Sequence, residues 1–122
     1  LQDILTNSFG TGKSGNEILA NTITIAKSKG IAPSIYTHPI GMHGHAAGPT
    51  IGMWDMQNGV PGSGDYKMYP NTCYSIELNA THHLSDWENP VKVALEQNGY
   101  FNGKNFSYID GRQTKIIPIT FN

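Results

Sequence analysis

The stretch Cys73-Tyr74-Ser75-Ile76-Glu77-Leu78-Asn79 alternates large apolar side chains with polar ones. Successive side chains of a β-strand point to opposite faces of a sheet, so this period of two predicts a strand with one apolar face. That face carries Tyr74, Ile76 and Leu78, and the other carries Ser75, Glu77 and Asn79. The strand therefore defines an apolar and a polar side of the predicted sheet.

The flanking sequence predicts helices before this strand and further strands after it. Apolar residues recur at helical spacing at the N-terminus and again over residues 16–29, where Gly30 suits the position after a helix. In the stretch 91–96, Val91, Val93 and Leu95 point to a core and Glu96 points away. Shorter extended segments are predicted at residues 31–36, 106–109 and 114–119. The sequence thus predicts an α+β fold with one or two helices on a mainly antiparallel sheet.

Composition narrows the class of protein. The chain of 122 residues has the length of one domain, and a net charge of -1 with 14% charged residues gives no basic patch for nucleic acid. A membrane-spanning helix needs a run of about 18 apolar residues, and the sequence has no such run. The single cysteine, Cys73, cannot form a disulfide within the chain, so a reducing compartment is expected and the cytoplasm is favoured.

Two glycine-rich stretches invite a binding role. Residues 10–15, Gly-Thr-Gly-Lys-Ser-Gly, resemble a phosphate-binding loop, but Asn7 stands where the first glycine is required and no strand precedes the stretch. A turn followed by an N-cap at Ser14 is the favoured interpretation. Residues 57–70 are rich in Gly, Pro, Asn and Asp and form a candidate binding loop.

Three of the five histidines lie within residues 38–45, among glycines and a proline that predict a loop. Imidazole and carboxylate groups suit Zn, Mn, Fe or Co, so a histidine from this loop and glutamates from two strands can assemble a metal site. Simpler interpretations remain for each of these residues. His43 can be a solvated loop histidine, and Glu77 and Glu96 can be strand residues that face solvent. Cys73 can be a packed thiol, and His82 and His83 can be surface histidines.

The order of the segments adds a resemblance to a known family. The segments are His38-Pro39-Ile40-Gly41, His45, Pro49, Ser75-Ile76-Glu77-Leu78 and Val93-Ala94-Leu95-Glu96. This order resembles the second half of the pita-bread metallopeptidases, which include methionine aminopeptidase, aminopeptidase P, prolidase and creatinase. Their motif is a His-Gly-Ile-Gly loop, a later His before a Pro, an apolar strand ending in Glu, and a final strand bearing another Glu.

The resemblance implies both a fold and a site. Residues 1–122 would be a single domain, the C-terminal, metal-binding half of a pita-bread fold with helices on a curved sheet. His38 and Glu77 would ligate one divalent metal (Mn, Zn, Co or Fe), and Glu96 would bridge two. Catalytic roles would fall to His45, which stabilises the tetrahedral intermediate, and to Glu77, which shuttles a proton. The substrate would be a peptide, as in an Xaa-Pro aminopeptidase.

The departures from the family limit this implication. The family's remaining metal ligands are two aspartates in the N-terminal half, which is absent from this sequence. Pro39, Ala46 and Leu78-Asn79 also differ from the usual motif. We therefore expect a chain that is inactive on its own. We also expect it to form a homodimer through the surface that the N-terminal half covers in the family. The alternative is a non-catalytic remnant or an interaction module of the same fold.

Overall fold

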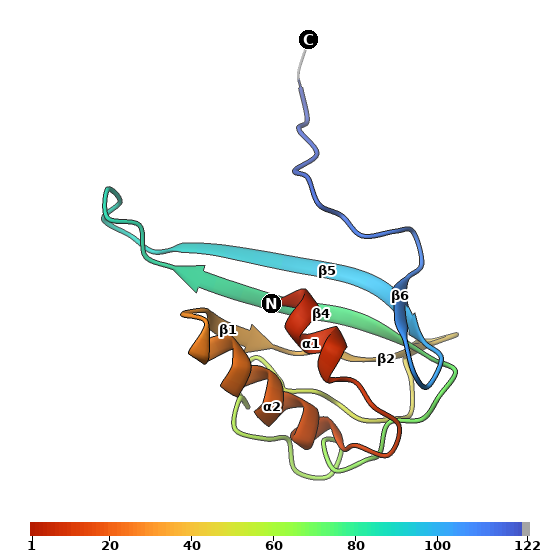
Figure 1. Cartoon of the computed structure of the whole chain (residues 1–122). Helices are drawn as coiled ribbons and strands as arrows, with labels where there is room; N and C mark the ends of the chain where they lie inside the picture. The colour runs from red at the N-terminus through yellow and green to blue at the C-terminus, as the bar shows by residue number, and fades with distance from the viewer. Residues whose placement is uncertain (121–122) are drawn as a thin grey trace.

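The computed structural model describes residues 1–120, and it confirms an α+β fold built on an antiparallel sheet. The elements are α1 (Gln2–Ser8), α2 (Gly15–Ser28), β1 (Ala32–Ile35), β2 (His38–Gly41), β3 (Gly44–His45), β4 (Thr72–His82), β5 (Val91–Phe101) and β6 (Phe106–Tyr108). The strand order is β3-β2-β4-β5-β6, with β1 also paired to β4. Both helices lie on the same side of the sheet (Figure 1).

The alternation in β4 separates the two faces as predicted. Tyr74, Ile76 and Leu78 are fully buried against Leu5, Phe9, Ile18 and Leu19 of the helical layer. β5 pairs with β4 over its whole length, and Leu78 lies directly opposite Leu95 on this core face. Residues opposite each other in an antiparallel pair share a face, so Glu77 and Glu96, also opposite each other, lie on the face away from the helices.

The histidine-rich segment is a β-hairpin, which corrects the prediction of a loop. Ile40 pairs with His45 and Gly41 with Gly44, and a turn of two residues joins the strands. Pro39 has no backbone N–H to donate to a neighbouring strand. It lies beside the end of the short β3, where its carbonyl accepts a hydrogen bond from the Ala46 N–H at 3.0 Å. Pairing of β2 with β4 therefore outweighs the local preference of Gly and Pro for irregular structure.

The long connection at residues 57–70 supports α2. The Asn16 side chain accepts a hydrogen bond from the Val60 N–H at 2.7 Å and donates one to the Val60 carbonyl at 3.2 Å. The Asn16 N–H donates to the Gly64 carbonyl at 2.9 Å. These bonds anchor the connection at the start of the helix, on the helical side of the fold.

The C-terminal segment differs from its prediction. Residues 114–119 form no strand, and Ile116 is 91% exposed. The segment extends away from the body of the protein beyond β6 (Figure 1). Within the described part of the chain, neither helix has the length and apolar character needed to cross a membrane.

The start of α2 is held by a capping box that also depresses one pKa. The Ser14 hydroxyl accepts from the Glu17 N–H at 3.1 Å, and the Ser14 N–H donates to the Glu17 carboxylate at 2.6 Å. The pKa of Glu17 is lowered from 4.5 to about 2. The main cause is the hydrogen bond from the Ser14 N–H, and the hydrogen bond from Lys67 is the next largest. The predicted N-cap at Ser14 is confirmed.

We predict that Glu17→Gln lowers stability in a pH-dependent way. Because the folded state depresses the pKa of Glu17, its charge stabilises the fold above the unfolded value of 4.5, and this contribution is lost as the pH falls towards about 2. Urea unfolding at a series of pH values should show the difference between variant and wild type shrinking over that window. Glu88→Gln, in the exposed β4–β5 loop, is the control. A difference that stays constant across the window contradicts the prediction.

Candidate functional site

His38 is held by its neighbours in one orientation. Its Nδ1 lies 2.9 Å from the Pro39 carbonyl oxygen, and its Nε2 lies 2.9 Å from Glu77 Oε1. A carbonyl oxygen only accepts hydrogen bonds, so Nδ1 carries a hydrogen and Nε2 is the nitrogen turned towards the carboxylate. Nε2 is then either protonated, which makes an ion pair with the carboxylate, or presents a lone pair, which accepts a hydrogen bond from a protonated carboxyl group or shares a cation with the carboxylate. The pair can therefore hold a proton or a cation between His38 and Glu77.

Glu77 and Glu96 add a second unusual feature. The two residues are directly opposite each other across the β4–β5 pair, on the face away from the helices. Like charges at directly opposite positions of an antiparallel pair destabilise the sheet. The Glu77 side chain is 22% exposed and faces His38, whereas Glu96 lies 3.4 Å from the Ser75 hydroxyl. Two carboxylates in this arrangement attract a cation.

His45 completes the group from the neighbouring strand. Its ring stacks on the His38 ring, with 3.8 Å between ring centroids and 16° between ring planes. His45 lies on β3 opposite Ile40, and so it projects from the same face of the sheet as His38 and Glu77. The exposed His45 ring lies beside the more buried His38. A hydrogen-bond donor is therefore available at the open side of the site.

One cavity of about 380 Å³, which we call the glutamate cavity, brings these side chains together; its lining includes His38, His45, Ser75, Glu77, Glu96 and Asn98. Sequence reasoning did not assign Ser75 or Asn98 to the site. The signal was present, because each lies two residues from a site glutamate on its strand and side chains two apart share a face.

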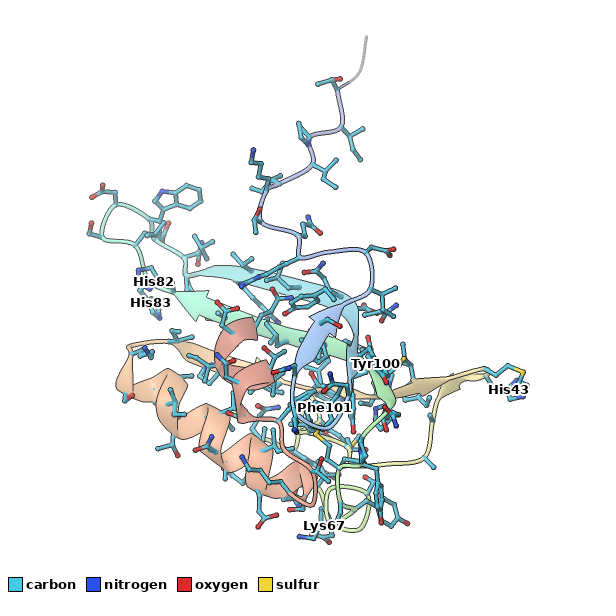
Figure 2. The ribbon with its side chains drawn as sticks, turned by 45° about the vertical axis from the view of Figure 1, so that its right-hand side comes forward. His43, Lys67, His82, His83, Tyr100 and Phe101 are labelled. Atoms are coloured by element: carbon cyan, nitrogen blue, oxygen red, sulfur yellow. The ribbon has the colours of Figure 1, made fainter. Side chains whose placement is uncertain are left out.

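The other histidines lie elsewhere. His43 is at the exposed tip of the β2–β3 hairpin and points away from the body of the protein (Figure 2). His82 and His83 lie near the β4–β5 loop, at the opposite end of the sheet, and both are exposed (Figure 2). Their positions agree with their interpretation as surface residues.

The donor set is incomplete for a metal ion. A catalytic zinc is held by three protein ligands and a water molecule. Among residues 1–120, no group of three or more His, Cys, Asp or Glu side chains is arranged to hold a metal ion. His38 and Glu77 supply two suitable donors with the tautomer fixed by Pro39, and Glu96 is the neighbouring carboxylate. The residues present fit part of a metal centre and not a whole one.

Comparison with known proteins extends the description of the fold. No protein-family model matches the chain, and no curated protein matches it. Among solved structures, the chain is similar to an X-Pro aminopeptidase from Thermotoga maritima, with a TM-score of 0.61 and 14% sequence identity. The similarity covers 93% of this chain and 29% of that enzyme, so the chain spans less than a third of its length. The two helices on an antiparallel sheet have the arrangement of half a pita-bread fold.

We predict that Glu96→Gln stabilises the fold. The change removes one of two facing negative charges and keeps an oxygen that can accept from Ser75, so the free energy of unfolding should rise by about 0.2–1 kcal/mol. Urea unfolding at neutral pH measures the change. Glu88→Gln is the control, since Glu88 lies in the exposed β4–β5 loop. Destabilisation by Glu96→Gln would show that the two carboxylates do not repel each other.

Proposed function

We propose that this chain is the C-terminal, metal-binding half of the catalytic domain of a metal-dependent peptidase, with an activity like that of an Xaa-Pro aminopeptidase. One observation carries the proposal: the four residues expected from the family motif line a single cavity on the face opposite the helices, in a fold similar to that of an X-Pro aminopeptidase. These residues are His38, His45, Glu77 and Glu96.

The residues have separate roles in the proposal. His38 and Glu77 would hold a divalent metal (Mn, Zn, Co or Fe), and Glu96 would supply the neighbouring carboxylate that the family shares with a second metal. A metal bound there would polarise the peptide carbonyl and lower the pKa of its bound water to about 7. Glu77 takes the proton from the attacking water, and His45 donates a hydrogen bond to the oxygen on which negative charge develops. The facing carboxylates and the tautomer of His38 support these roles.

The incomplete donor set decides what this chain does alone. Two well-placed donors and one neighbouring carboxylate bind a divalent ion weakly, because tight catalytic sites use at least three protein ligands. The further ligands are proposed to come from outside residues 1–122, where the family has its aspartates. These 122 residues are then inactive by themselves. A non-catalytic remnant of the same fold is the alternative, and the same incomplete donor set favours it.

We predict that Mn²⁺ binds this chain weakly, at the glutamate cavity. Paramagnetic broadening in NMR spectra detects weak binding, and it should be strongest for the amides around His38, Glu77 and Glu96. The adjacent pair His82 and His83 is the competing site at the other end of the sheet. Broadening centred on that pair, and removed by His83→Ala, would overturn the proposal.

Affinity and turnover complete this experiment. Calorimetry with Mn²⁺ or Zn²⁺ should show affinity weaker than micromolar or no heat of binding, and an Ala-Pro-Ala peptide should not be cleaved in the presence of metal. Glu77→Ala is the control in both assays. Tight binding or cleavage that disappears in Glu77→Ala would show that the chain alone completes its site.

The same proposal includes self-association. Within residues 1–120, β6 pairs with β5 only at residues 99–101, so the outer edge of β5 from Val91 to Gln97 has no strand partner. Val93 on this edge is 54% exposed. An unpaired edge of this length binds a further strand readily, and a second copy of the chain supplies the same edge in reverse.

We predict a concentration-dependent homodimer in sedimentation velocity at micromolar concentrations. Val93→Lys places a charge on the edge and should shift the protein towards the monomer, because charged edge residues oppose strand pairing. Leu84→Lys, in the β4–β5 loop, is the control for added charge. A wild-type monomer at all concentrations contradicts the prediction, as does equal dissociation by both variants.

A further inference from the structure

The free edge of β5 presents a defined set of unpaired backbone groups. On this edge, which faces away from β4 (Figure 1), the Asn98 carbonyl accepts a hydrogen bond from the Ile109 N–H at 3.1 Å. Backbone groups of successive strand residues point alternately to the two sides, so Glu96, Ala94 and Lys92 present theirs to the same edge as Asn98. Within the described part of the chain, β6 pairs with β5 only at positions after Asn98. Lys92, Ala94 and Glu96 therefore offer their N–H and C=O groups to a further strand.

The side chains of the same three residues carry opposite charges. Residues two apart on a strand share a face, so Lys92, Ala94 and Glu96 all project from the face that carries the glutamate cavity. Lys92 is exposed, and it forms no ion pair with any described residue. Glu96 lies opposite Glu77, so its negative charge is only partly offset within the chain. The edge thus carries a base, a small residue and an acid at equal spacing.

This spacing makes the edge complementary to itself in reverse. When a second copy pairs antiparallel to β5 with Ala94 opposite itself, Lys92 of each copy lies opposite Glu96 of the other. Directly opposite residues of an antiparallel pair have neighbouring side chains, and opposite charges there are stabilising. All three residues also exchange their outward backbone groups with outward groups of the partner. One register therefore satisfies both the backbone and the charges.

Neighbouring registers lack this match. With Val93 at the centre, Glu96 faces Pro90, which has no N–H to donate. With Leu95 at the centre, Lys92 faces Asn98, whose carbonyl already bonds to β6's side of the edge. Centring the pair on Lys92 or on Glu96 places like charges opposite each other, which is destabilising.

A cavity at the edge has room for the incoming lysine. This cavity of about 350 Å³, the edge cavity, is lined by Glu96 and Asp110 together with three side-chain amides, Gln97, Asn98 and Gln113, and by Gly111. None of these residues is basic. A lysine ammonium has three donors and no acceptor, so carboxylates and amide oxygens suit it. Glu96 also lines the glutamate cavity, so a charge bound in the edge cavity acts on the candidate site.

We propose that two copies pair through β5 with Ala94 opposite itself, so that Lys92 of each copy enters the edge cavity of the other and pairs with Glu96. The inference rests on the self-association in the proposed function, and it adds a residue that one copy contributes to the site of the other. The ammonium group supplies positive charge beside the facing carboxylates of Glu77 and Glu96, and so it offsets their repulsion. The twofold axis through Ala94 closes the assembly at two copies.

Cysteine cross-linking tests the register. In a Cys73→Ser background, Ala94→Cys should form a disulfide-linked dimer under mild oxidation. Opposite residues of a hydrogen-bonded pair have Cα atoms about 5.5 Å apart, within the range of about 4.4–6.8 Å that disulfides span. Val93→Cys and Leu95→Cys would not lie opposite themselves, so each should link at least tenfold more slowly. Faster linking at either of these positions than at Ala94 overturns the register.

A charge exchange tests the contact of Lys92 with Glu96. In sedimentation velocity, Lys92→Glu and Glu96→Lys should each weaken the dimer at least tenfold, because every dimer contains the contact twice. The double variant restores the pair with its charges reversed, so its dimer should return to within threefold of the wild type. Lys104→Glu, exposed in the β5–β6 turn, is the control for lost positive charge and should change nothing. A double variant no better than the single ones, or an equal loss in Lys104→Glu, overturns the contact.

The outcomes separate this interface from the proposed function. A dimer that Val93→Lys dissociates but that fails the cross-linking and exchange tests keeps the self-association and overturns the register. A wild-type monomer at all concentrations overturns both. Mn²⁺ broadening away from the glutamate cavity overturns the proposed metal site and leaves the interface standing.

Discussion

The pairing of β4 with β5 over eleven positions, from Thr72 opposite Phe101 to His82 opposite Val91, is the constraint on which the rest of the structure depends. A slip of one residue in either strand would turn its apolar side chains away from the helices and its glutamate into the core. The observed register places Leu78 opposite Leu95 under the helices and Glu77 opposite Glu96 on the other face. β1 and β2 then add to the free edge of β4 and bring His38 to Glu77.

Sequence reasoning predicted the parts of this arrangement that depend on periodicity. Alternation in residues 73–79 and 91–96 was sufficient to identify both strands and to place both glutamates on the polar face. It failed where tertiary pairing overrides local preference: residues 38–45 have the composition of a loop and form a hairpin because β4 supplies hydrogen-bonding partners. The opposite failure occurs at residues 114–119, where an apolar pattern typical of a strand has no partner among the described residues.

The candidate site was only partly predictable for a related reason. Motif order gave His38, His45, Glu77 and Glu96, but a sequence does not specify that the His38 and His45 rings stack. The role of Pro39 was also hidden. Its carbonyl accepts both from the Ala46 N–H and from His38 Nδ1, so one residue closes the hairpin and sets the imidazole. In sequence, Pro39 was a residue that favours a tight turn and a departure from the expected glycine, and neither feature indicates that its carbonyl accepts from His38.

The two faces of the sheet have different roles, which explains how the protein tolerates a site that lowers its stability. The helical face is closed by residues that are almost completely buried, among them Leu5, Leu19 and Ile76, and this packing provides most of the stability. The opposite face carries facing carboxylates, which lower stability, and its neighbouring loop carries an exposed Trp54, which adds little to stability. Residues that weaken a fold yet line a shared cavity are typical of a surface retained for binding. Because the core does not depend on them, substitutions on this face report on chemistry and recognition more than on folding.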